Sequence, residues 1–184
     1  MRCTSMKKTT LDTYSLMIVS KYFNSPSDYI NAMLTSKKHT ILFTRFHYNP
    51  IEETFLFKKL ETQHVYSRSS TLIPHKFQYK VWYSVTYQET YNKVENIEYM
   101  NVEYTNTDVR LYGVDIPKCE RVRSVALKCF CECNYITSLT LPEGILNISE
   151  SAFMNCRELQ EVVLPDTLIS IGKTAFSFCG KLSR

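Results

Sequence analysis

Residues 141–159 read LPEGILNISESAFMNCREL, residues 164–182 read LPDTLISIGKTAFSFCGKL, and these two stretches decide the fold. Both begin with Leu-Pro, carry Ala-Phe in the middle and end with Leu, and equivalent positions lie 23 residues apart. A looser copy at residues 116–136, IPKCERVRSVALKCFCECNYI, matches once two extra residues are allowed after Pro117. Repetition at one fixed interval is the signature of a solenoid, in which each copy forms one coil.

Five positions recur in register across the three copies. A coil of constant length places equivalent side chains at the same point of its cross-section, so we expect ladders of like residues inside it. The predicted ladders are Phe130, Phe153 and Phe176; Cys133, Cys156 and Cys179; Val125, Ile148 and Ile171; Val122, Ile145 and Leu168; and Ile136, Leu159 and Leu182.

Residues 139–141 and 162–164 have the inward and outward alternation of strands, and each segment is followed by a proline that closes it. We expect these strands to pair in parallel between adjacent coils. The Ala-Phe pairs at 152–153 and 175–176 predict a short helix or 3₁₀ turn on the opposite side.

The same register explains four of the seven cysteines. Three of them form an inward ladder, and Cys129 stands where the other copies have Ala152 and Ala175. Zinc binding by Cys129, Cys131 and Cys133 is the alternative, but their spacing lacks the usual CxxC turn. We therefore predict structural thiols, no metal and no cofactor.

The pattern LPxxLxxIgxxAFxxCxxL, as in residues 164–182, resembles the BspA-like class of leucine-rich repeats, of the protist and amoebal type. The resemblance covers residues 116–184. It implies a right-handed β-solenoid whose concave parallel sheet recognises proteins and, in some members, serves adhesion. The repeats stop at Arg184 without a polar capping unit, so the chain is a candidate truncated product, and its open edge is a candidate for self-association.

Only outward strand positions can meet a partner on that face, because the inward positions are filled by the ladders. The candidate protein-binding residues are Ser138, Thr140, Glu161 and Val163.

Residues 9–40 predict a helical hairpin. Leu11, Tyr14, Ile18 and Tyr22 have the spacing of an amphipathic helix, and a second helix is expected from Ser27 or Asp28 to about residue 39. The stretch is weakly similar to an F-box, through Leu11, Ile18, Tyr22-Phe23, Pro26-Ser-Asp28 and Thr35-Ser-Lys37, although it lacks the usual Leu-Pro start. That resemblance implies a Skp1-like partner and a role as substrate adaptor of a ubiquitin ligase.

Residues 78–91 alternate tyrosine or valine with polar residues, which predicts one strand. Residues 101–104 predict a second strand after a turn at 92–96, and the resulting β-hairpin would cap the first repeat. Tyrosines stacked on bases or sugars are the alternative. The predicted fold class is α/β: a basic helical region at 1–77, a Tyr-rich β cap at 78–115, and a short leucine-rich-repeat solenoid at 116–184.

Composition favours a folded chain, with 44% hydrophobic and 22% charged residues among 184. Residues 1–80 hold twelve basic and five acidic residues, whereas residues 81–184 hold ten and thirteen. The basic runs are no longer than Lys7-Lys8, so nucleic-acid binding is not expected. Neither a signal peptide nor a membrane span is evident, which predicts a cytoplasmic protein, with surface display by an unconventional route left open.

Catalysis is not expected. His39, His47, His64 and His75 lack a metal-binding spacing, and four glycines give no phosphate-binding loop. A Cys-His pair assembled in three dimensions stays open as an alternative. We therefore predict a non-catalytic protein-protein interaction module; the alternatives are the F-box-type adaptor and a fragment of a cell-surface adhesion protein.

Overall fold

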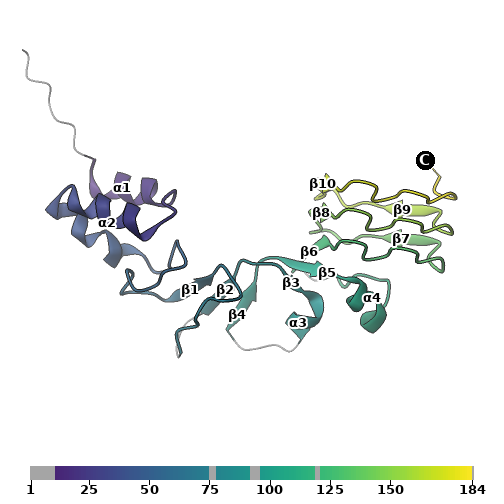
Figure 1. Ribbon diagram of the computed structural model, residues 1–184, viewed down its shortest axis with the longest axis horizontal. Helices are drawn as coiled ribbons and strands as arrows, with labels where there is room; N and C mark the ends of the chain where they lie inside the picture. The colour runs from purple at the N-terminus through teal and green to yellow at the C-terminus, as the bar shows by residue number, and fades with distance from the viewer. Residues whose placement is uncertain (1–10, 75–77, 92–95, 119–120, 184) are drawn as a thin grey trace, which may run out of the picture. The chain divides into compact units, whose positions relative to one another are not determined.

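The computed structural model describes residues 11–74, 78–91, 96–118 and 121–183. The chain divides into two compact units, Met1–Lys80 and Val81–Arg184 (Figure 1). The elements of the first unit are α1 (Thr13–Ser20), α2 (Pro26–Leu34), the 3₁₀ helix η1 (Lys37–Arg45), β1 (Thr62–Val65) and β2 (Gln78–Val81), in which the division falls.

Two helices, α1 and α2, lie in the stretch predicted as a helical hairpin, but α2 ends at Leu34 rather than near residue 39, and the 3₁₀ helix η1 follows it. Asp12 caps α1 by accepting the backbone N–H groups of Tyr14 and Ser15 at 2.9 and 3.0 Å. The helix α2 begins earlier than expected, because Ser25 is the N-cap and forms a capping box with Asp28. Pro26 then occupies the first turn, where its missing N–H costs nothing.

The predicted apolar face of the first helix is not the buried one. Leu11, Tyr14, Ile18 and Tyr22 are 43 to 80% exposed, whereas Leu16 and Ser20 are buried. The reason lies in α2: the hydroxyl of fully buried Tyr29 donates to the Ser20 carbonyl at 2.6 Å and thereby fixes which side of α1 faces inward. Around Tyr29 lies an aromatic core of Phe23, Phe43, Phe46 and Phe57.

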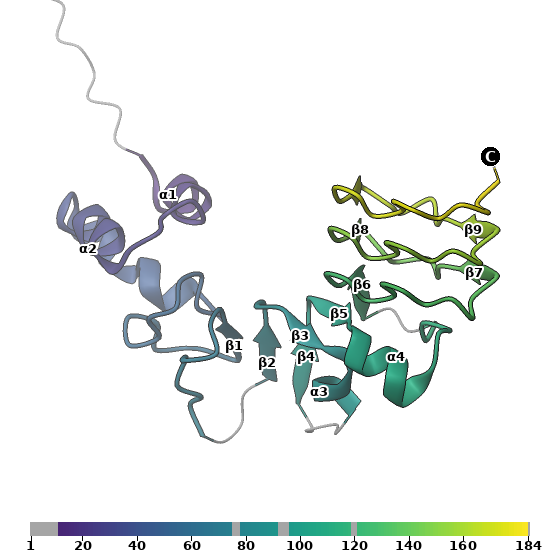
Figure 2. The ribbon, with the colours of Figure 1, turned by 45° about the vertical axis from the view of Figure 1, so that its right-hand side comes forward.

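The second unit winds as a stack of coils (Figures 1 and 2). One parallel sheet has the strand order β10-β8-β6-β5-β3, and a second parallel pair is formed by β7 and β9. The strands are β3 (Val85–Thr86), β4 (Ile97–Tyr99), β5 (Val102–Tyr104), β6 (Val122–Val125), β7 (Ser138–Thr140), β8 (Asn147–Ile148), β9 (Glu161–Val163) and β10 (Ser170–Ile171), with helices α3 (Tyr87–Tyr91) and α4 (Asn106–Tyr112).

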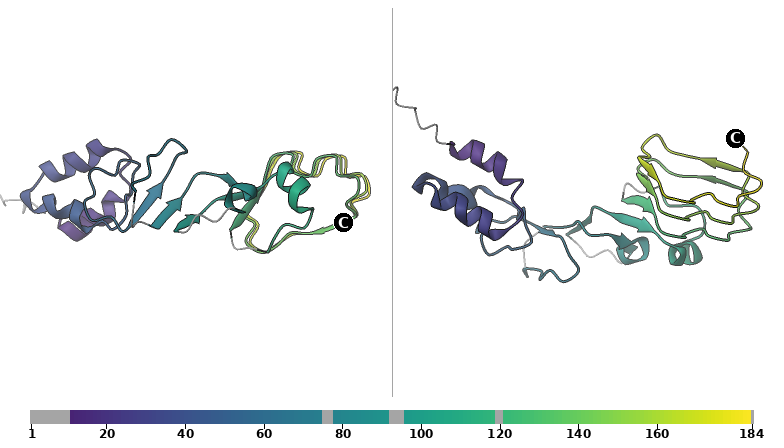
Figure 3. Two further views of the ribbon diagram at one scale, coloured as in Figure 1. Left: turned by 90° about the horizontal axis from the view of Figure 1, so that it is seen from below. Right: turned by 45° about the horizontal axis from the view of Figure 1, so that its top comes forward.

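Parallel pairing of the strands that precede the two Leu-Pro pairs is confirmed. Leu139 lies opposite Val162, 23 residues later, and Ile148 lies opposite Ile171 at the same interval. Seen along the solenoid, the coils superimpose (Figure 3, left). The 23-residue sequence interval is therefore the circumference of the coil.

Of the predicted short helix or 3₁₀ turn at the Ala-Phe pairs, the 3₁₀ turn is the one present, because this side consists of successive turns with hydrogen bonds to the third residue before rather than of a continuous helix. In one coil the N–H groups of Ala152, Met154 and Cys156 each donate to the carbonyl three residues before. The N–H groups of the residues between them donate to the next coil, as Phe153 does to Ala175 at 2.8 Å. Residues with positive φ angles occur at two points of each coil and prevent a continuous helix. The first point is Lys128, Ser151 or Thr174 in successive coils, and the second is Glu132, Asn155 or Phe178.

The prediction of one strand over residues 78–91 is wrong. The segment holds two strands, β2 and β3, and residues 87–91 form α3, whose second residue, Gln88, donates its N–H to buried Asp108 at 2.8 Å. No antiparallel hairpin joins β3 to β5; the two strands are parallel. Both insert valines into the coil, since Val85 is 2% and Val102 0% exposed, so the parallel sheet begins before the predicted boundary at 116.

Four tyrosines of this stretch pack on one another. The ring centroid of Tyr87 lies 5.7 Å from that of Tyr104 and 5.2 Å from that of Tyr112, and Tyr91 lies 5.3 Å from Tyr112. These contacts give the tyrosines a packing role.

Among the described residues, no helix has the length and apolar character needed to cross a bilayer.

Candidate functional site

The interior of the coils is filled by the predicted phenylalanine ladder. The rings of Phe130 and Phe153 are stacked with centroids 4.9 Å apart, and those of Phe153 and Phe176 with centroids 5.0 Å apart. Tyr104 adds a further ring at 6.4 Å from Phe130, a position that the 23-residue interval does not reveal. A partner therefore has no access to the coil interior and must bind outside it.

The thiols are part of this interior, as the register predicts. The Sγ atom of Cys156 donates to the Phe130 carbonyl at 3.0 Å, and that of Cys179 to the Phe153 carbonyl at 3.1 Å. Burial raises the pKa of the Cys156 thiol to about 12 and also raises the pKa of Cys129. Thiols held in the protonated form are poor nucleophiles.

Within the described part of the chain, no group of three or more His, Cys, Asp or Glu residues is placed to hold a metal ion. Cys3, Cys119 and His75 lie outside the described residues. The other histidines have partners of their own. The two ring nitrogens of His39 lie 3.1 Å from the Leu11 carbonyl and 2.9 Å from the Thr35 hydroxyl. His47 is 2.9 Å from the Glu61 carboxylate, and the ring of His64 stacks on Tyr48.

The four candidate contact residues are exposed on β7 and β9. The parallel register places Ser138 beside Glu161 and Thr140 beside Val163. Between them on β7, Leu139 is 4% exposed and points into the core. The strand pair therefore presents two rows of outward side chains, one coil apart.

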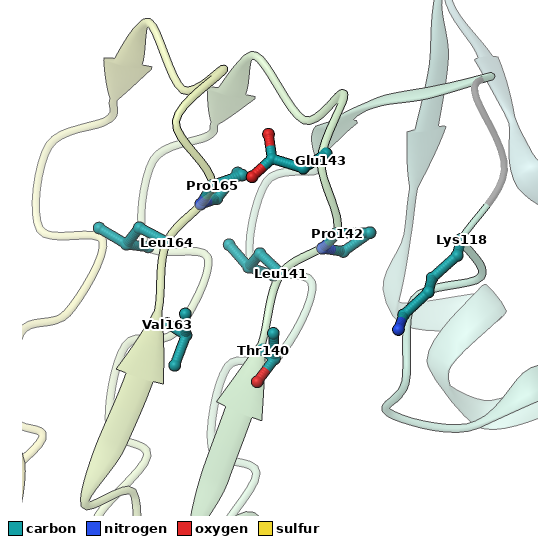
Figure 4. A pocket seen from close by; sticks show the side chains of 8 residues that line it. All are labelled: Lys118, Thr140, Leu141, Pro142, Glu143, Val163, Leu164 and Pro165. Atoms are coloured by element: carbon teal, nitrogen blue, oxygen red, sulfur yellow. The ribbon is translucent and has the colours of Figure 1, made fainter.

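A groove lies where these strands end (Figure 4). Its volume is about 380 Å³, and it is lined by Lys118, Thr140, Leu141, Pro142, Glu143, Val163, Leu164 and Pro165. Two of the four candidate residues, Thr140 and Val163, line it, whereas Ser138 and Glu161 lie two residues earlier on the same strands. The sequence prediction located part of the groove and missed the rest.

The missed lining residues are the two Leu-Pro pairs and Lys118. The Leu-Pro pairs carry a sequence signal, because they recur in both full copies, but this recurrence by itself predicts only the end of a strand and not a groove. Exposure separates their roles: Leu141 is 3% exposed, whereas Leu164 is 40% exposed and available to a ligand. No repeat equivalent marks Lys118, so no signal in the sequence could have found it.

The loops behind the prolines are tied together from one coil to the next. Glu143 accepts the backbone N–H of Asp166 at 3.3 Å, and the Gly144 N–H donates to the Thr167 hydroxyl at 2.9 Å. The Thr167 hydroxyl in turn donates to the Ile145 carbonyl at 3.0 Å. This wall of the groove is therefore held by hydrogen bonds that cross the coils.

The groove has the composition of a binding surface. Five of its eight lining residues are apolar, and the others supply one ammonium, one hydroxyl and one carboxylate. None of its described lining residues is a histidine or a cysteine, so these residues do not include the usual nucleophile and base pair. What the arrangement can do chemically is to exclude water over an apolar patch and to orient a polar group.

The face of the last coil is more open than those before it. Ile171 is 49% exposed, whereas its equivalent Ile148 is 1% exposed. Self-association through this edge stays a prediction.

Comparison with known families is consistent with the coil geometry. The family model described as "BspA type Leucine rich repeat region (6 copies)" matches residues 102–184, a range that includes β5 and begins before the repeats seen in the sequence. No curated protein and no solved structure matches the chain. The family model does not reach the helices of the first unit, so the F-box resemblance and its Skp1-like partner stay predictions.

Proposed function

Because residues 102–184 belong to the BspA type of leucine-rich repeat, we propose that the chain is a non-catalytic protein-interaction module whose partner lies across β7 and β9. Repeats of this family point to protein interaction or adhesion and are in general not catalytic. The partner is a protein, and the strand face is the concave side that the family resemblance implies.

One observation carries the proposal: the outward pair Thr140 and Val163 lies in register at the mouth of an apolar groove. Val163 and Leu164 are 46% and 40% exposed and lie next to each other on the same coil. Protein interfaces depend on a few central apolar contacts from which water is removed. Val163 and Leu164 supply such apolar contacts on the outer face of β7 and β9, next to the polar side chain of Thr140.

The test is a pair of charge substitutions on this face. Thr140→Arg with Val163→Arg places two bulky cations over the groove without touching the interior ladders. We expect the double variant to fold, as judged by circular dichroism and thermal unfolding, and to lose the protein partner that the wild-type chain retains from a native lysate. The partner is identified by mass spectrometry and then tested as a purified protein.

The matched control is Asn147→Arg with Ser170→Arg. These residues are also exposed, also opposite each other in a parallel pair, and one coil apart, but they lie in the other sheet. The control variant should bind the purified partner as the wild type does. Equal binding by the folded Thr140/Val163 variant would refute the assignment of this face.

A further inference from the structure

The groove beside Thr140 and Val163 has an apolar floor and a charged end, and the two together restrict what it can hold. Its apolar side chains come from equivalent points of two adjacent coils: Leu141 and Pro142 from one, Val163, Leu164 and Pro165 from the next. Neighbouring parallel strands lie about 4.8 Å apart, so the floor extends across the strands. An apolar side chain laid across both coils contacts the exposed parts of Val163 and Leu164.

The charged end is Lys118. Figure 4 shows its side chain leaning toward Thr140 from the segment that precedes β6. Lys118 is exposed and forms no ion pair with any other residue that the structure describes. Glu143 accepts the Asp166 N–H, so one acceptor site of that carboxylate is occupied. Among the described lining residues, the cation that can attract a carboxylate is the ammonium group of Lys118.

The acidic residues of the second unit restrict where a carboxylate ligand is attracted. Residues 81–184 carry thirteen acidic and ten basic residues, so an acidic ligand is not drawn to the unit as a whole. Attraction of a carboxylate is instead local to single cations, and Lys118 is the one that lies next to the apolar floor. A charge-assisted hydrogen bond at that point fixes the orientation of a ligand more than it adds overall affinity.

Resting on the proposed function, we propose that this groove takes an extended protein segment with one apolar side chain and a nearby carboxylate. The apolar side chain lies against Val163 and Leu164, and the carboxylate binds the ammonium group of Lys118. The carboxylate belongs to an Asp or Glu side chain of that segment.

The test uses synthetic peptides and the full chain. The first set of peptides is labelled with fluorescein and amidated at the C-terminus. Each peptide has one Leu and one Asp in a Gly/Ser background, and the position of the Asp relative to the Leu differs from peptide to peptide. A matched set has Asn in place of Asp, and a third set has no acidic side chain but a free C-terminal carboxylate near the Leu. Fluorescence polarisation then gives the affinity of each peptide.

We expect the best Asp peptide to bind about tenfold more tightly than its Asn partner, a difference of about 1.4 kcal/mol. Lys118→Met keeps most of the apolar stem, removes the charge and should abolish this preference. The control Lys181→Met changes an exposed lysine of the same unit that pairs with Glu158 and does not line the groove, and it should retain the preference. Binding of the third set more tightly than the Asp set, with the same dependence on Lys118, would overturn the assignment of the carboxylate to a side chain.

Equal binding of Asp and Asn peptides, an unchanged preference in Lys118→Met, or no binding by any peptide set would each overturn this inference. These outcomes are distinct from failure of the proposed function. If the peptides fail while Thr140→Arg with Val163→Arg still removes the captured partner, the strand face is the binding site and the ligand chemistry is different. If both fail, the proposed function fails as well.

Discussion

The rings of Phe130 and Phe153 are stacked nearly parallel, with their planes only 4° apart and their centroids at 4.9 Å. An isolated aromatic pair adopts edge-on as well as stacked arrangements. Here the centroid separation matches the strand spacing of about 4.8 Å, so the coil backbone imposes the stack. The same relationship between Phe153 and Phe176, at 5.0 Å and 2°, shows that successive coils have the same geometry at this point.

Removing the middle ring should have a large effect on stability. Phe153 is fully buried between two other rings, so Phe153→Ala should lower the free energy of unfolding by about 3 to 5 kcal/mol. Urea denaturation followed by the fluorescence of Trp82, which lies in the second unit, measures this change. Leu127→Ala, at a side chain that is 60% exposed, is the control and should cost far less. A loss below about 1 kcal/mol for Phe153→Ala would contradict the ladder.

Gly172 marks a point where two coils approach each other too closely for a side chain. A Cβ atom at this position would lie 2.4 Å from the backbone nitrogen of Glu150. Gly172→Ala should therefore force the coils apart and destabilise the protein by about 1 to 3 kcal/mol. Gly180→Ala, where a Cβ meets nothing within 4 Å, should change the thermal midpoint little. Similar midpoints for the two variants would be inconsistent with this packing.

Phe178 is strained, and the equivalent residue one coil earlier shows how to relieve the strain. Phe178 has φ 61° with a side chain that is 77% exposed, and Asn155 has φ 64°. Because asparagine tolerates the left-handed region, Phe178→Asn should stabilise the chain by about 0.5 to 1 kcal/mol. Phe178→Val should destabilise it, since β-branched residues fit this region worst. Thermal unfolding should rank the three proteins in that order, with the asparagine variant highest.

The buried thiols should make stability depend on pH in the alkaline range. Burial raises the pKa of Cys156 to about 12, whereas the thiol of the unfolded chain ionises near pH 8.5. The folded state therefore keeps a proton that the unfolded state loses, and stability falls as pH rises above about 8.5, by up to about 1.4 kcal/mol per pH unit for each such thiol. Below that pH the contribution is fully present.

Cys156→Ala should make this decline shallower between about pH 8.5 and 10. Denaturant titrations under reducing conditions at several pH values give the slope for each protein. Parallel slopes for the wild type and the variant would show that the Cys156 thiol ionises equally in both states.

The coils could be predicted from the sequence because the same side chains recur in their interior. The turns could not be predicted, because they depend on backbone φ angles that these residue types do not signal. Phe, Cys and the apolar ladders are visible at the 23-residue interval. The turns at the Ala-Phe pairs depend on left-handed φ angles at Lys128, Ser151 and Thr174. None of these residue types signals such a conformation, since glycine is the residue that usually does.

The early strands and the first helix were missed for different reasons. Tyr104 stacks on Phe130 across an interval of 26 residues, and β5 pairs with β6 through an irregular register at Val102, so the repeat period is lost there. In α1, both faces carry apolar residues, and the contact between Tyr29 and Ser20 selects the one that is buried. Such a choice depends on tertiary contacts that periodicity does not encode. The same holds for Lys118, which reaches the groove from outside the repeat pattern.

Photo-crosslinking tests the central claim most directly, because the crosslink itself reports which face lies next to a partner. The photoreactive amino acid p-benzoylphenylalanine replaces Val163 in one protein and Ser170, on the other sheet of the same coil, in a second. Irradiation in native lysate should give a discrete adduct with one protein from position 163 and none from position 170, and the adduct should disappear when Thr140→Arg is added. An adduct that forms at position 170 instead, or that forms equally at both positions, would contradict the account.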